Sequence, residues 1–280
     1  MADSQGILHK SRDDIKLRKA EFVDKWKLCN ITNADGRTGG IAEAMEGADV
    51  CIALSKPGPD TIQKEWVAKM GKAAIVFLCA NPIPEMWPWD AKAAGAAVVA
   101  TGRSDFLNQV NNSLGFPGIF RGTLDVRART ITDEMCIAAA EELARVAEEK
   151  GLSSDYIMPT MDDVDVFARE AAAVAMKAIK QGVAGIADVT FEQEYEYAGK
   201  LIARARGMVH DAMALGYIEM PEGSKPPKPS KQALKAVDNY QRCGGDKPEV
   251  LRAGLAAATA LGRREQIEKL GKLLPPAQNQ

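Results

Sequence analysis

Three asparagines are the residues of this sequence whose type and position best suit the binding of a small polar ligand. Asn81 follows the apolar run Ala74–Cys79, and Asn111 and Asn112 lie downstream of a second apolar run, Ala97–Ala100. An amide offers a hydrogen-bond donor and an acceptor, so it suits a ligand that carries carboxylate, hydroxyl and carbonyl oxygens. It performs no acid or base chemistry by itself. The alternative interpretation is that Asn81 stabilises a turn and that Asn111 and Asn112 cap a helix.

Short apolar runs that stop at polar, glycine or proline residues are typical of buried parallel strands that open onto loops. The segments 49–54, 74–79 and 97–100 have this form, and segments with helical spacing separate them. In an open parallel α/β sheet the loops at the carboxyl ends of the strands form the crevice where ligands bind. The sequence therefore predicts a parallel α/β sheet whose carboxyl-end loops carry the three asparagines.

Composition excludes several classes of protein. The chain has 280 residues, of which 46% are hydrophobic and 26% charged, and a formal net charge of −2. This composition suits a globular protein and gives no reason to expect nucleic acid or an anionic membrane as a partner. Five widely spaced cysteines form no CxxC pair, and Cys51 and Cys79 lie in apolar runs as small buried hydrophobes. With no apolar leader segment in the sequence, we expect a cytoplasmic protein.

Four strings carry a resemblance to a known family: SKPG (55–58), IVFLCANPIPE (75–85), VATGRSDFLNQVNN (99–112) and FPGIFRGTLDVRA (116–128). In this order they are similar to the NAD-binding domain of malic enzymes of the bacterial and archaeal type. The resemblance runs from about residue 3 to residue 184. It implies a partial Rossmann-like parallel sheet flanked by helices in residues 1–185. Residues 186–280 are then a mostly helical extension, with a proline-rich linker at 221–230.

The resemblance also implies roles for the polar residues of the carboxyl-end loops. Asn81 and Asn112 match residues that contact L-malate. Ser55, Asn81 and Asn111 match residues that face the nicotinamide part of NAD or NADP. These groups position ligands and transfer no protons.

Two residues near the start of the chain match the positions that face the ADP part of the cofactor. They are Asp3 and Arg12, and an acid at this place in a dinucleotide-binding domain bonds the adenosine ribose. Asp3 would suit the free ribose hydroxyl of NAD, but one acid does not decide between NAD and NADP. The alternative is that both residues are solvated surface charges.

Several parts of a malic enzyme have no counterpart in this sequence. No glycine-rich turn precedes Asp3, and the cluster Gly36–Gly40 is typical of a loop before a helix. In the family the lysine and tyrosine that transfer protons, and the acidic ligands of Mg²⁺ or Mn²⁺, lie upstream of that turn. We therefore assign no catalytic residue and no metal ligand to this chain, and expect the divalent cation to be held outside it.

Three hypotheses remain open from the sequence. In the first, the chain is a subunit or fragment of a malic enzyme that converts L-malate to pyruvate, and a companion chain or a missing N-terminal part completes it. In the second, it is a catalytically inactive Rossmann-like binding or scaffold module. In the third, it is an intact dehydrogenase of another family. The first two hypotheses predict that the isolated chain is inactive. They also predict an uncovered hydrophobic edge of the sheet, which a partner or the C-terminal extension should cover.

Two smaller predictions concern residues around the crevice. Arg103 is expected to form a structural ion pair with Asp105 or Asp125 rather than to bind an anionic ligand. Trp87 and Trp89, which flank Pro88, could form an exposed platform, but we expect them to be buried packing residues at the edge of the domain.

Overall fold

The computed structural model describes the whole chain except residues 222, 225–226, 229, 243–247 and 275–280. Contacts between residues divide the chain into two compact units, Met1–Tyr195 and Glu196–Gln280, which we describe separately. The domain boundary between residues 185 and 186 stays a prediction. Part of the predicted linker at 221–230 lies outside the described residues.

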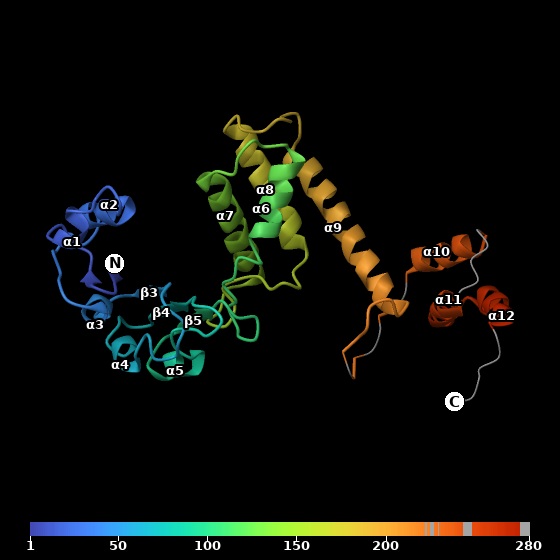
Figure 1. Ribbon diagram of the computed structural model, residues 1–280, viewed down its shortest axis with the longest axis horizontal. Helices are drawn as coiled ribbons and strands as arrows, with labels where there is room; N and C mark the ends of the chain where they lie inside the picture. The colour runs from blue at the N-terminus through green and yellow to red at the C-terminus, as the bar shows by residue number, and fades with distance from the viewer. Residues whose placement is uncertain (222, 225–226, 229, 243–247, 275–280) are drawn as a thin grey trace. The chain divides into compact units, whose positions relative to one another are not determined.

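A three-stranded parallel sheet forms the centre of the first unit (Figure 1). Its strands are β3 (Val50–Ala53), β4 (Ile75–Leu78) and β5 (Val98–Thr101), in the order β3-β4-β5. Their apolar and largely β-branched residues favour extended backbone. Val50 pairs with Ile75, and Ile75 pairs with Val98, so the three strands end at the same edge. The predicted partial Rossmann-like α/β fold is confirmed.

One face of this sheet is covered by three short helices. They are α3 (Ile41–Met45), α4 (Lys64–Val67) and α5 (Pro88–Ala93). Met45, Val67 and Ala91 from these helices pack with Val76 and Leu78 of β4 in one apolar core. As the sequence predicts, the segment before α3 is a loop that ends at its N-cap, Gly40.

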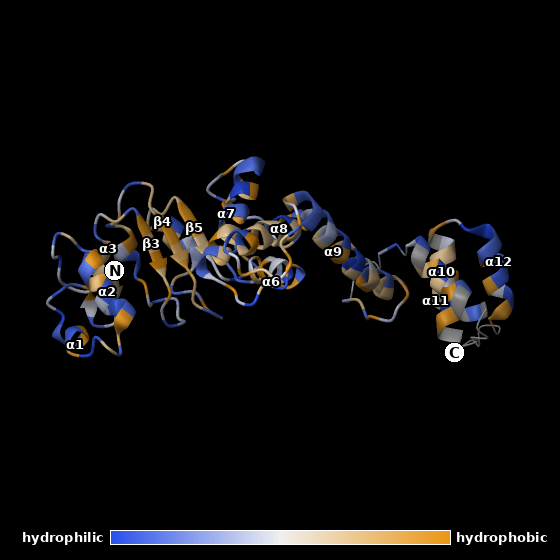
Figure 2. Ribbon diagram, turned by 90° about the horizontal axis from the view of Figure 1, so that it is seen from above, coloured by the Kyte–Doolittle hydropathy of each residue, from blue (hydrophilic) through white to orange (hydrophobic). Residues whose placement is uncertain are grey.

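The opposite face of β3 is uncovered among the described residues. Val50, Ile52 and Leu54 are 47%, 62% and 79% exposed, and Figure 2 shows the apolar character of the strands. The predicted hydrophobic edge is therefore present. Cys51, on the covered face, is half-buried, and burial raises the pKa of its thiol to about 11.

A small subdomain precedes the sheet. Strands β1 (Ala2–Asp3) and β2 (Gly6–Ile7) form an antiparallel pair, and helices α1 (Asp13–Lys16) and α2 (Val23–Ile31) follow. Leu8, Ile15 and Cys29 form its apolar core. Residues 17–22 separate these two helices.

Three packed helices follow the sheet. They are α6 (Phe116–Asp125), α7 (Asp133–Lys150) and α8 (Asp165–Lys180). Gly122 allows α6 to approach α8 closely, because a Cβ there would lie 2.1 Å from the Ala171 carbonyl oxygen. The hydroxyl of Thr132 accepts a hydrogen bond from the Met135 amide and caps α7.

Helix α9 (Phe191–Ala214) begins in the first unit and continues into the second. The second unit also contains α10 (Lys231–Arg242), α11 (Pro248–Ala260) and α12 (Arg264–Leu273). Leu234, Val237, Leu251 and Leu270 form its own apolar core. The predicted helical extension is confirmed. Among the described residues, none of the helices has the length and apolar character needed to cross a bilayer.

Candidate functional site

The amides of Asn81 and Asn111 converge on Gly102, at the carboxyl ends of β4 and β5. A Cβ on Gly102 would lie 3.1 Å from both Nδ2 and Oδ1 of Asn81, so the Asn81 amide lies directly over this glycine. Asn111 Nδ2 donates a 2.8 Å hydrogen bond to the Gly102 carbonyl. The structure therefore brings together two of the predicted site residues that are thirty positions apart in the chain.

The two asparagines before α6 differ in what their side chains do. Asn111 Oδ1 accepts a 2.9 Å hydrogen bond from the Ser113 amide, so both ends of its amide are held. Asn112 is exposed, and its side chain has no hydrogen-bond partner among the described residues. The N-cap of α6 is Gly115, without a side-chain cap, so the alternative that the two amides cap this helix is wrong.

A buried carboxylate, Glu85, ties Ser55 to the loop that carries Asn81. Glu85 is fully buried; its Oε1 accepts a 2.9 Å hydrogen bond from the Ser55 amide, and its Oε2 a 3.0 Å bond from the Ala80 amide. The Ser55 hydroxyl lies 3.3 Å from the same Oε1. Sequence analysis missed this residue. Its one signal is an acid placed among the apolar residues of the IVFLCANPIPE string.

Asn108 is a second supporting residue that sequence analysis missed. It is buried with a φ of 54°, a left-handed conformation that asparagine tolerates better than most residues. Its Nδ2 donates to the carbonyls of Val99 and Ser154 at 3.0 and 2.8 Å, and its Oδ1 accepts from Ile157 at 3.0 Å. Asn108 thus fixes the segment between β5 and Asn111.

Arg103 is a structural residue, as predicted. Its Nε and Nη2 donate to the Asp105 carboxylate at 2.8 and 2.7 Å, and its Nη1 donates to the Pro82 carbonyl at 3.0 Å. The second contact links the loop after β5 to the loop that holds Asn81. Asp125, the other predicted partner, pairs with Arg121 instead.

The prediction that both tryptophans are buried is wrong: Trp87 is half-buried and Trp89 is exposed. This side chain is 57% exposed and stacks on Trp87, with ring centroids 5.1 Å apart. Phe106 contacts both rings edge-on. Because the three rings cover one another, Trp89 has enough apolar contact to stay in place at the surface.

Asp3 and Arg12 form an ion pair at 3.1 Å rather than standing as separate solvated charges. Lys25 also binds the Asp3 carboxylate, at 2.7 Å. Burial raises the pKa of Asp3, but the hydrogen bonds from Lys25 and Arg12 outweigh this effect and lower it to about 2. Arg12 further binds Asp14 at 2.6 Å. The two predicted ADP-facing residues lie together, and their charged groups are engaged with each other.

Two buried acids in the helical part of the unit carry raised pKa values. Burial and the neighbouring Glu142 raise the pKa of Glu170 to about 9, and neither of its carboxyl oxygens has a hydrogen-bond partner among the described residues. Burial and a hydrogen bond shared with Asp125 raise the pKa of Glu194 to about 7. Both acids lie on alanine-rich or charged helices, where sequence analysis gave no sign of their burial.

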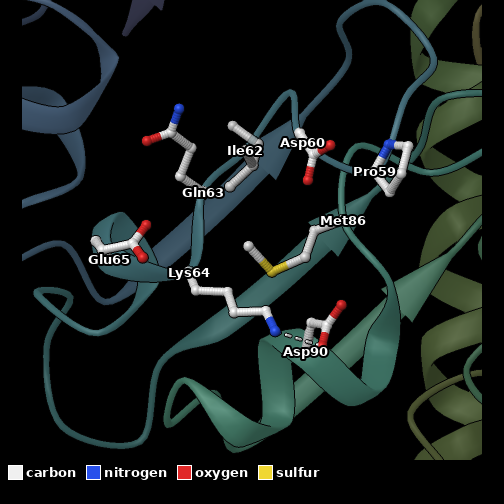
Figure 3. A pocket seen from close by; sticks show the side chains of 8 residues that line it. All are labelled: Pro59, Asp60, Ile62, Gln63, Lys64, Glu65, Met86 and Asp90. Atoms are coloured by element: carbon white, nitrogen blue, oxygen red, sulfur yellow. Dashed lines mark ion pairs between the residues drawn. The ribbon is translucent and has the colours of Figure 1, made fainter.

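A cavity of about 320 Å³ lies between α4 and α5 (Figure 3). Its lining includes Asp60, Glu65 and Met86, and a 2.7 Å ion pair between Lys64 and Asp90 crosses it. None of the six predicted site residues lines this cavity. In the part of the chain that the structure describes, no group of three or more His, Cys, Asp or Glu residues could hold a metal ion.

Comparison with models of known protein families assigns this chain to a family. Residues 1–181 match the family model described as the malic enzyme NAD binding domain. This chain belongs to the malic enzyme family. Its β3–β5 sheet is thus part of a malic enzyme NAD-binding domain.

Two bacterial malic enzymes are among the proteins similar to this chain. It is 46% identical over 190 residues to the bifunctional malic/malolactic enzyme of Bacillus subtilis, covering 66% of this chain and 44% of that protein. It is 47% identical over 158 residues to the NAD-dependent malic enzyme of Geobacillus stearothermophilus, covering 56% of this chain and 32% of that protein. The chain spans less than half the length of these malic enzymes.

Solved malic enzymes share the fold. The Entamoeba histolytica malic enzyme matches with a TM-score of 0.69 and 43% identity, over 96% of this chain and 48% of that one. The Pyrococcus horikoshii enzyme matches with a TM-score of 0.64 and 48% identity, over 70% of this chain and 45% of that one. The first match extends beyond residue 184, where the resemblance read from the sequence ended.

Proposed function

We propose that this chain is the NAD(P)-binding part of a malic enzyme that oxidatively decarboxylates L-malate to pyruvate and carbon dioxide. A separate chain, or an N-terminal part outside these 280 residues, supplies the groups that transfer protons. The observation that carries this proposal is the convergence of Asn81 and Asn111 on Gly102 in a member of the malic enzyme family. A pure scaffold has no physical need for amides at the carboxyl ends of β4 and β5.

The exposed amides suit the substrate. Asn81 and Asn112 are exposed and have no side-chain hydrogen bonds within the described residues, so their donors and acceptors are available to malate oxygens. Asn111 is held in place by Gly102 and Ser113, and Ser55 by Glu85, and these two residues face the nicotinamide ribose. The chain's own contribution is to bind and orient the two ligands.

The residues near Gly102 fit the nicotinamide end of the cofactor better than Asp3 and Arg12 fit its ADP end. The amide and hydroxyl groups near Gly102 are accessible, whereas the Asp3 carboxylate already accepts from Gln5, Arg12 and Lys25. Binding of an ADP ribose at Asp3 therefore requires displacement of the Lys25 ammonium. The bound cofactor accepts the hydride. The residues around Asp3 do not indicate whether NAD or NADP is preferred.

The described residues do not fit a divalent cation, because no cluster of three potential ligands exists among them. In our proposal Mg²⁺ or Mn²⁺ is held by the complementary part of the enzyme.

The test is the effect of Asn112→Ala in the assembly purified from native cells. Removal of an amide that bonds malate lowers kcat/KM for malate by a factor of about 10 to 1,000. Asn30→Ala, at an exposed asparagine of α2, is the matched control and leaves activity unchanged. Equal kinetics for both variants would show that Asn112 is structural.

The second candidate is a catalytically inactive binding or scaffold module. The engagement of Asp3 in two ion pairs favours it, because a working dinucleotide site needs that carboxylate free. Cofactor reduction by the native assembly distinguishes the two candidates. A malic enzyme reduces its cofactor when malate is added, whereas a scaffold binds its partner without reducing any cofactor.

A further inference from the structure

Two buried carboxyl groups meet where helix α9 begins. Glu194, in the first turn of α9, is 3% exposed, and the side chain of Asp125, the last residue of α6, is 4% exposed. Their carboxyl groups share a hydrogen bond. Carboxylate oxygens only accept hydrogen bonds, so this contact requires a proton on one of the two groups. The contact therefore exists only while the pair holds a proton.

An ionised Glu194 would be poorly accommodated at this position. Its Oε1 is buried without a hydrogen-bond partner among the described residues. The cation beside the pair, Arg121, already binds Asp125: its Nε donates to Asp125 Oδ2 at 2.6 Å, and its Nη2 donates to Oδ1. A second carboxylate next to Asp125 would thus be a buried charge beside a like charge, which is unfavourable.

Asp125 and Arg121 are the charged groups that act on Glu194 among the described residues. Burial and the contact with Asp125 raise the pKa of Glu194 to about 7, and the smaller effect of Arg121 lowers it. Other charged groups at the start of α9 are engaged elsewhere. They are Glu192 and Glu196 on α9, which are exposed, Asp165 on α8, which accepts from Tyr195, and Arg169 on α8, which binds Glu142 and Glu149.

Glu194 is also one of the few buried side chains at the start of α9. Among residues 191–200, all of which the structure describes, only Glu194 and Ala198 are buried. The cap of the helix, in which Thr190 and Gln193 exchange hydrogen bonds of 2.9 and 3.3 Å, is exposed. Exposed hydrogen bonds compete with water and contribute little net stability. The attachment of this first turn therefore depends strongly on the contact of Glu194 with α6.

We propose that Glu194 and Asp125 form a pH-sensitive latch that holds the first turn of α9 against α6. The latch is closed while the two carboxyl groups share a proton, and it opens when that proton passes to solvent and both groups ionise. The boundary between the two compact units follows Tyr195, the residue after Glu194. The latch thus acts on the segment through which the chain passes from the first unit into the second.

The direction of the pH effect follows from the raised pKa of Glu194. This pKa is about 7 with the latch closed against an ordinary 4.5, so the closed state binds the proton more tightly than the open state. The latch is fully stable below about pH 4.5. Between that value and about pH 7, each pH unit raises the ratio of open to closed latch about tenfold, and above about pH 7 the ratio levels off.

Amide hydrogen exchange of the full chain at pH 5 and pH 7 tests the inference. After correction for intrinsic exchange rates, the protection of the amides of residues 195–200 should fall about 100-fold between these values. In Glu194→Gln the side-chain amide donates to Asp125 at either pH, so the fall should be less than about threefold. Glu192→Gln, at an exposed acid of the same turn, should keep the wild-type fall.

Asp125→Asn is a second variant that removes one carboxyl group of the pair. It leaves Glu194 as the single acid, so most of the pH-dependent fall in protection should disappear here too. Protection of residues 195–200 that stays constant between pH 5 and pH 7 in the wild type would overturn the latch. Falls of equal size in the wild type, Glu194→Gln and Asp125→Asn would overturn it as well. Activity is not measured, so the outcome is independent of the proposed function.

Discussion

The side chain of Asn111 donates a 2.8 Å hydrogen bond to the carbonyl of Gly102, and this bond ties the segment before α6 to the end of β5. The amide of Asn81, from the loop after β4, lies where a side chain on Gly102 would begin. A glycine at this position leaves room for that amide. The approach of the Asn81 amide to the end of β5 depends on this lack of a side chain.

Gly102→Ala is therefore expected to disturb Asn81. The added Cβ would lie 3.1 Å from both polar atoms of the amide, which must move by a few tenths of an ångström. Because Asn81 is exposed, the shift costs little stability but displaces the amide that we propose binds malate. We expect KM for malate in the native assembly to rise by about tenfold. Gly207→Ala, where a Cβ meets nothing within 4 Å, is the control; equal KM values for the two variants would contradict the assigned role of Asn81.

Glu85→Ala is expected to destabilise the first unit. It removes the acceptor of the Ser55 and Ala80 amides, and a buried donor left unpaired costs about 1–3 kcal/mol. Glu85→Gln keeps one acceptor oxygen and should lose less. Urea unfolding of the isolated chain measures both effects. A free energy of unfolding unchanged by Glu85→Ala would show that neither hydrogen bond contributes to stability.

Much of the candidate site could be predicted from local sequence patterns. The rest depends on contacts between residues far apart in the sequence. Apolar runs predicted β4 and β5, and their common carboxyl edge predicted that Asn81 and Asn111 would meet. The burial of Glu85 depends on the loop of Ser55, thirty residues upstream, which no local spacing reveals. Lys25 reaches Asp3 across twenty-two residues, so the ion pair that engages this carboxylate was equally hidden.

In helices α6 to α8, too, the sequence predicts local features but not contacts between distant residues. The start of α7 can be read from the sequence, because Thr132 is a favoured N-cap residue and a cap acts within one turn. Glu170 looks like a surface acid on an alanine-rich helix. It is buried because Gly118 lets α6 approach, so that a Cβ there would lie 2.7 Å from Glu170 Oε2. The exposure of Trp89 depends on stacking with Trp87 and Phe106, which hydrophobicity alone does not predict.

Glu170 should make stability depend on pH. Its pKa is about 9 in the folded chain against an ordinary 4.5, so the folded state holds more protons between these values. The free energy of unfolding therefore falls as pH rises through this window, with a slope of about 1.4 kcal/mol per pH unit for one proton. Glu194, whose pKa is raised from 4.5 to about 7, adds to this slope only below about pH 7.

Urea unfolding at pH 7 and pH 9 isolates the contribution of Glu170. The wild type should lose about 1–3 kcal/mol between these values, and Glu170→Gln should lose clearly less. Glu141→Gln, at an exposed acid of α7, keeps the wild-type dependence. A loss of equal size in Glu170→Gln and wild type would show that Glu170 is not the buried proton carrier.

The most direct test of the central claim is the activity of the purified 280-residue chain alone. Supplied with L-malate, Mn²⁺ and either NAD or NADP, it should produce no reduced-cofactor absorbance above a blank without protein, because in our proposal these residues position the ligands and the groups that move protons belong to another part of the enzyme. The native assembly under the same conditions should produce it. Malate-dependent cofactor reduction by the isolated chain would contradict the account.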